Sequence, residues 1–113
     1  MKSKKELKNE YKQMKFQIGV FQIKNQINNK VMLDSSVNIT AKCNRHRIEL
    51  NLGSHINKDL QKDWIIHGED NFTFEILSEL KHKENNDDLK EVTLLEKMMA
   101  EEFETNGILF YNN

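Results

Sequence analysis

One face of a predicted helix between residues 38 and 52 carries a histidine among apolar side chains. The positions that share this face, at i, i+4, i+7 and i+11, are Ile39, Cys43, His46 and Leu50. A histidine that faces a core needs a hydrogen-bond partner, so His46 is either a satisfied core residue or a functional group. Lys42, one turn earlier, and the neighbouring Arg45 could reach a phosphate from the same helix.

A second apolar stripe, on a helix predicted from about Asp88 to Thr105, contains a carboxylate. Its members, again at i, i+4, i+7 and i+11, are Val92, Glu96, Met99 and Phe103. Burying an unpaired carboxylate costs on the order of several kcal/mol, so Glu96 needs a partner. Two interpretations stay open. One is a structural salt bridge to Lys or Arg; the other is a hard divalent ion such as Mg²⁺ or Mn²⁺, held with waters and phosphate oxygens.

These helices belong to a predicted α+β domain with a small three-stranded antiparallel sheet. Helix-starting side chains follow the hairpin at Ser35, Ser36 and Asn38, Asn57 starts the next helix, and glycines end both helices. The first strand is expected to alternate, with Phe16, Ile18 and Val20 on one side. The predicted elements, in the order α-β-β-α-α-β-α, are a helix at residues 2–14, a hairpin at 16–38, helices at 38–52 and 57–68, a strand at 72–80 and a helix at 88–105. We divide the chain into an N-terminal helical extension, 1–15, and one domain, 16–113.

The other histidines and the aromatic side chains are assigned to the surface and the core. Trp64 and the phenylalanines are expected to pack in the core rather than to form a base-stacking platform. His55, His67 and His82 have no spacing typical of a zinc site and are expected on the surface.

Length and composition favour one folded domain. The chain has 113 residues, of which 31% are charged, and a mean hydropathy of -0.76. Its single cysteine, Cys43, excludes an internal disulfide, and the polar first residues do not resemble a signal peptide. No apolar run is long enough to span a membrane, so we expect a cytoplasmic protein without a membrane partner.

Charge is divided along the chain. Residues 1–62 hold 13 Lys and Arg against 5 Asp and Glu, whereas residues 63–113 hold 4 against 13. The first half could meet phosphate, although solvated helix faces would give the same count. The candidate nucleic-acid-binding residues are Lys42, Arg45 and Arg47.

The order of several motifs resembles that of the GIY-YIG nuclease family, in particular its small stand-alone bacterial members. In that family, Gly-Ile-Tyr and Tyr-Ile-Gly strands carry two catalytic tyrosines; here the triplets read Gly19-Val20-Phe21 and Met32-Leu33-Asp34. The matching motifs that follow are Ser35-Ser36-Val37-Asn38-Ile39, then Lys42 and His46, then Gly68-Glu69-Asp70-Asn71-Phe72, and then Leu94-Leu95-Glu96.

The resemblance implies roles for these positions. Phe21 and Met32 stand where the family has its tyrosines, Lys42 where it has an arginine, and Asp34 where it has a glycine. His46 would bind the scissile phosphate and Glu96 a single divalent ion, Mg²⁺ or Mn²⁺, while Asn112 is a weak match for the asparagine of the family site.

The departures from the family fall on chemistry rather than on packing. Phe21 has no proton to exchange and Met32 is an apolar filler, so both are expected to be inert. We therefore expect a nucleic-acid-binding domain, with DNA as the first partner considered and RNA as the second, whose metal-dependent cleavage is weak or absent. Two alternatives stay open: an active Mg-dependent endonuclease with a substituted general base, and a non-catalytic module that binds a protein partner or a second copy.

Overall fold

Three antiparallel strands form the sheet, and the first strand lies at its centre. β1 (Ile18–Asn25) pairs with β2 (Val31–Ser36) on one side and with β3 (Phe72–Leu80) on the other. The protein is described by a computed structural model covering residues 16–111. The predicted helix at residues 2–14, and with it the predicted N-terminal extension, lies outside the described residues.

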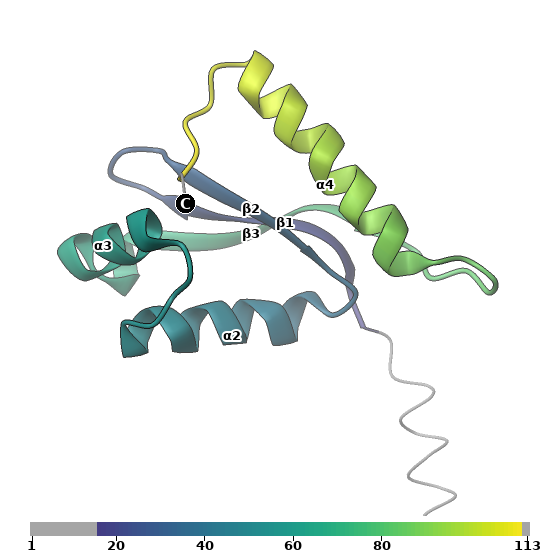
Figure 1. Ribbon diagram of the computed structural model, residues 1–113, viewed down its shortest axis with the longest axis horizontal. Helices are drawn as coiled ribbons and strands as arrows, with labels where there is room; N and C mark the ends of the chain where they lie inside the picture. Colours follow the sequence, from purple (N-terminus) through teal and green to yellow (C-terminus); the bar gives the residue numbers. More distant parts are fainter. Residues whose placement is uncertain (1–15, 112–113) are drawn as a thin grey trace, which may run out of the picture.

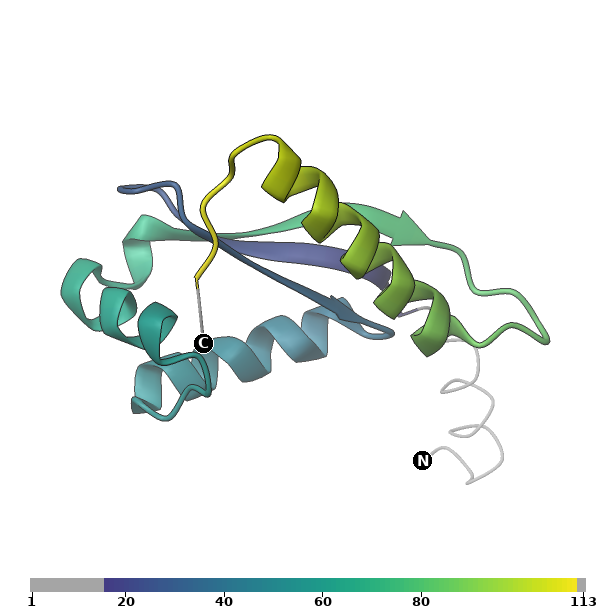
Figure 2. The same cartoon turned by 45° about the horizontal axis from the view of Figure 1, so that its top comes forward.

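Helices cover both faces of this sheet, so the predicted α+β fold is confirmed. α2 (Ile39–Leu52) and α4 (Asp88–Thr105) lie on opposite faces, and α3 (Lys58–His67) follows α2 (Figures 1 and 2). A single turn of 3-10 helix, Glu69–Asn71, leads into β3. None of the helices within residues 16–111 has the length and apolar character needed to cross a membrane.

Local capping explains why the predicted helix ends agree with the structure. The side chains of Asn38 and Asn57 accept hydrogen bonds from the backbone N–H groups of Ala41 and Leu60, at the starts of α2 and α3. Gly53 ends α2 in the left-handed conformation, with φ 75°. These signals act over three or four residues, and sequence alone therefore reveals them.

The first strand does not alternate between a buried and an exposed face as expected. Val20 and Phe21 are adjacent, yet both are 0% exposed, because β1 is the central strand and helices cover it on both sides. Phe21 faces α2 and α3, in a core cluster with Ile39, Leu50 and Trp64. Trp64 is 4% exposed, so its predicted place in the core is confirmed.

The segment after α4 returns to the sheet and is hydrogen-bonded to the start of β2. The Val31 N–H donates to the Leu109 carbonyl at 2.9 Å, and the Tyr111 N–H donates to the Val31 carbonyl at 2.9 Å. The Tyr111 hydroxyl donates to Asp63 at 2.7 Å and accepts from the Asn25 amide at 3.0 Å. Burial and the bond to Asp63 raise the pKa of Tyr111, so it remains a neutral donor. Asn112, the next residue, lies outside the described residues.

Gly19 is required by the close approach of β3. A Cβ atom at this position would lie 1.9 Å from the Ser78 carbonyl oxygen. We expect Gly19→Ala to lower the free energy of unfolding by about 1–3 kcal/mol or more, because the backbone must move to accept the methyl group. Urea denaturation measures this. Gly53→Asn is the matched control, since that position is open and asparagine tolerates a positive φ; equal urea midpoints for Gly19→Ala and the wild type would contradict the prediction.

Candidate active site

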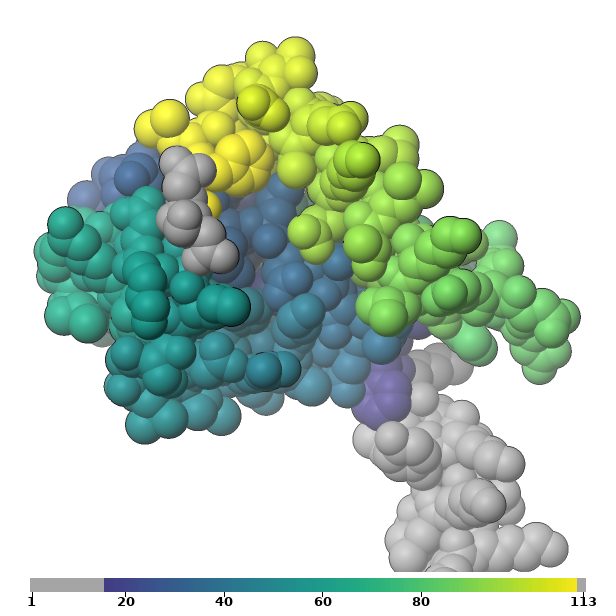
Figure 3. Space-filling model, in the orientation of Figure 1, coloured from purple at the N-terminus to yellow at the C-terminus, as the bar shows by residue number. Residues whose placement is uncertain are grey.

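The residues that the sequence singles out meet along the edge strand β2. Because side chains alternate along a strand, Met32 and Asp34 face α2, whereas Ser35 faces α4. In the space-filling view, β2 and α2 form a surface between α4 and α3 (Figure 3). The site is therefore built from both faces of the sheet at one edge.

Asp34 is bound by three donors. His46 Nε2 lies 2.7 Å from Oδ2, Lys42 Nζ lies 3.3 Å from Oδ1, and the Ser35 N–H donates to Oδ1 at 2.8 Å. The Lys42 ammonium also donates to the Ser35 carbonyl at 3.2 Å. The basic residues that the motif order aligns with the phosphate-binding groups thus already have a carboxylate partner within the protein.

A second histidine fixes the orientation of the first. His46 Nδ1 lies 2.8 Å from His55 Nε2, and His55 Nδ1 accepts the Asn57 N–H at 3.0 Å. The network assigns the tautomers: His55 carries its proton on Nε2 and donates it to His46, which carries its own proton on Nε2 and donates to Asp34. Both ring nitrogens of His46 are engaged, so no lone pair is left to accept a proton from water.

His55 was expected on the surface, and this expectation was wrong. The residue is 0% exposed, and its backbone N–H donates to the Gln61 side chain at 3.0 Å. Sequence gives no signal for it, because its ring partner lies nine residues earlier on another element. Of the other two histidines, His67 is half-buried and His82 is exposed.

Burial and hydrogen bonding set the charge states of the site. Burial acts to raise the pKa of Asp34, but the bonds from His46 and Ser35, together with the charge of Lys42, bring that pKa below its usual value. Burial, followed by the effect of His46, lowers the pKa of His55. At neutral pH the site therefore contains a charged Asp34 and a neutral His55.

Glu96 lies on the α4 side of the same edge. Its Oε1 accepts the Ser35 hydroxyl at 2.6 Å, and among residues 16–111 no lysine or arginine forms an ion pair with it. Within residues 16–111, no three His, Cys, Asp or Glu side chains gather as a metal-binding group. A single carboxylate beside a hydroxyl fits Mg²⁺ only if waters and phosphate oxygens complete the coordination.

The two positions that the motif order assigns to tyrosines carry no hydroxyl. The Phe21 ring lies edge-on to the His46 ring, with centroids 5.9 Å apart, and it is 0% exposed. Met32 is partly buried against the same core. Neither side chain can exchange a proton at the site.

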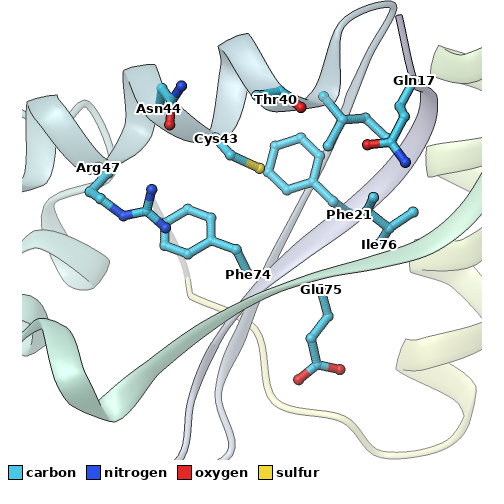
Figure 4. Close-up of a pocket in the computed structure, with 10 residues that line it drawn as sticks. Gln17, Phe21, Thr40, Cys43, Asn44, Arg47, Phe74, Glu75 and Ile76 are labelled. Atoms are coloured by element: carbon cyan, nitrogen blue, oxygen red, sulfur yellow. The ribbon is translucent and has the colours of Figure 1, made fainter.

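Arg45 and Arg47 are not brought together with Lys42 and His46. Arg45 bonds Glu49 at 2.8 Å on the outer face of α2. Arg47 lies over the Phe74 ring, 4.6 Å from its centroid, and 3.3 Å from Glu69. Figure 4 shows it beside Phe74, in a hollow of about 240 Å³ between α2 and β3 that Cys43 also lines. The predicted basic set is therefore spread over different sides of one helix.

Solved structures of an endonuclease domain are similar to this chain. A glutamate-to-alanine mutant of the catalytic domain of the intron endonuclease I-TevI is 27% identical, with a TM-score of 0.70 over 86% of this chain and 93% of that chain. The catalytic domain of homing endonuclease I-TevI is 26% identical, with a TM-score of 0.68 over 85% of this chain and 99% of that chain. No protein-family profile and no curated protein sequence matches the chain.

The chain is therefore an α+β domain whose fold is similar to that of an endonuclease catalytic domain. More narrowly, the chain has a GIY-YIG-like fold, as the order of its motifs predicts.

The lowered pKa of His55 predicts how stability depends on pH. His55 in the unfolded chain, with a pKa near 6.5, binds a proton more readily than His55 in the folded protein. The contribution of neutral His55 to the free energy of unfolding is therefore complete above pH 6.5, and it is lost as the pH falls through the lower pKa of the folded state. The lowered pKa of Asp34 causes a similar loss of stability only at a pH below 3.8, the ordinary pKa of an aspartate. We expect thermal unfolding at about pH 5 to occur at a lower temperature than at about pH 7.

The matched variants are His55→Gln and His82→Gln. The difference in melting temperature between the two pH values should shrink in His55→Gln and persist in His82→Gln, where the histidine is exposed. Equal differences in the two variants would contradict the assignment of His55 as a buried neutral group.

Proposed function

We propose that the protein is a GIY-YIG nuclease-family domain that binds nucleic acid, and whose metal-dependent phosphodiester cleavage is weak or absent. DNA is the favoured partner and RNA is the alternative. The observation that carries this proposal is the state of His46. One of its nitrogens accepts from His55 and the other donates to Asp34, while Phe21 and Met32 supply no hydroxyl. A general base contributes roughly 10²–10⁴ in rate, so its absence leaves little activity.

Divalent metal use follows from the likeness to endonuclease domains and is part of the proposal. Glu96 would hold the ion, with the Ser35 hydroxyl orienting the carboxylate. A bound Mg²⁺ or Mn²⁺ would supply charge stabilisation for a phosphoryl oxygen. Lys42 would retain positive charge toward a phosphate but lacks the two-pronged grip of arginine.

A cleavage assay on supercoiled plasmid with Mg²⁺ or Mn²⁺ tests the catalytic part. We expect the wild type to nick no more DNA than Glu96→Ala, because neither protein has a tyrosine hydroxyl or a free imidazole nitrogen at the site to act as general base. Glu101→Ala, an exposed carboxylate on the same helix, is the control for the loss of one charge. Robust nicking by the wild type that Glu96→Ala abolishes and Glu101→Ala does not would instead favour an active endonuclease, and in that case Met32→Tyr should raise the rate.

The salt dependence of duplex binding tests the binding part. Phosphate contacts release counterions, so affinity should fall as salt rises from about 50 to about 200 mM. Arg45→Ala should make the plot of log affinity against log salt less steep by about 1, because the Arg45 side chain is 78% exposed and could contact a phosphate. Lys97→Ala, on the acidic half of the chain, should leave the slope unchanged. No duplex binding at the lower salt would favour a protein partner instead.

A further inference from the structure

The donors around Asp34 form a set suited to an anion. An ammonium group, an imidazole N–H and a backbone N–H converge on its carboxylate from Lys42, His46 and Ser35. Lysine side chains and backbone N–H groups are among the donors with which proteins bind phosphate. One of the protein's own side chains thus fills a position that phosphate oxygens could take.

We propose that Asp34 is the specificity-determining residue of this site, because its carboxylate takes the place of a phosphate group between Lys42 and His46 and excludes phosphodiesters. This inference rests on the proposed function and deepens it, since it names the residue that keeps the substrate's phosphate away. A phosphate brought to the same donors meets a second negative charge at contact distance, and like charges held close cost much of the binding free energy.

The donors do not depend on Asp34 for their positions. Lys42 and His46 are four residues apart on α2, and the Ser35 N–H belongs to the backbone of β2. His46 is held from behind by His55, which is fully buried and anchored by the Asn57 N–H. When the Asp34 carboxylate is removed, an anion site with three donors is therefore left in place.

The exposure of these groups allows a phosphate to reach them. The side chains of Asp34 and His46 are 19% and 13% exposed, and that of Lys42 is 37% exposed. The carboxylate is thus at the mouth of the site and not deep in the core. A substitution there changes the charge that an incoming phosphate meets without opening a core cavity.

The experiment measures binding of inorganic phosphate to the whole chain, read at the His46 ring by NMR. Asp34→Asn keeps the size of the side chain and removes its charge. We expect its dissociation constant for phosphate to be lower than that of the wild type by about tenfold or more. Adding Lys42→Ala to Asp34→Asn should remove most of this gain, because a donor of the site is then missing. A short DNA duplex, tested at fixed salt, should show the same ranking.

Glu101→Gln is the matched control, since it changes the net charge equally on exposed α4. Asp34→Gly, which leaves no side chain at all, provides a second variant if the asparagine amide itself occupies the donors. Equal phosphate affinity in the wild type and both Asp34 variants, or an equal gain in Glu101→Gln, would overturn the inference.

Failure of the inference and failure of the proposed function are distinguishable. Strong cleavage by the wild type would contradict the proposed function but would leave the phosphate measurement to decide on Asp34. If cleavage is found and Asp34→Asn abolishes it, Asp34 is a participant in the reaction, and the inference is overturned together with the weak-activity proposal.

Discussion

The hydrogen bond between His46 and the fully buried His55 is the interaction on which the form of the site depends. It joins α2 to the loop before α3, and it determines which nitrogen of His46 points to β2. If His55 were absent, His46 could rotate or present a lone pair to solvent. With His55 in place, His46 is a fixed donor, and a fixed donor at a strand edge recruits an anion. Asp34 supplies that anion from within the chain.

The sheet order explains why the site lies at an edge. β1 is covered by helices on both faces, so its side chains are committed to the core. β2 is an edge strand, and the tail pairs with its first residue, Val31. The other end of β2 holds Asp34 and Ser35, one facing α2 and the other facing α4. Ser35 contacts groups from both helices, since its carbonyl accepts from Lys42 and its hydroxyl donates to Glu96.

Sequence predicted the elements better than their contacts. The bounds of α2, α3 and β3 follow from caps and periodicity, which act within one or two turns. The stripe positions of His46 and Glu96 likewise predicted that each needs a partner. The partners themselves, His55 and Ser35, were missed as such because they lie on other elements, and only the tertiary fold brings them near. The burial of both faces of β1 was missed for the same reason, because the sequence pattern of one strand does not show whether that strand lies at the centre or at the edge of the sheet.

Stability and catalysis make opposite demands on this edge. A working phosphate site must keep its cations without an internal partner until substrate arrives, and unpaired groups of this kind reduce stability. In this protein the arrangement favours stability. Lys42 and His46 both contact Asp34, and Phe21 packs in the core without a buried hydroxyl that would need a partner. A glycine in place of Asp34 would leave the Lys42 ammonium and the His46 N–H open to solvent and to ligands. The carboxylate of Asp34 and the apolar side chains of Phe21 and Met32 are therefore consistent with each other, since the carboxylate gives the donors a partner and the apolar side chains add no polar group that would need one.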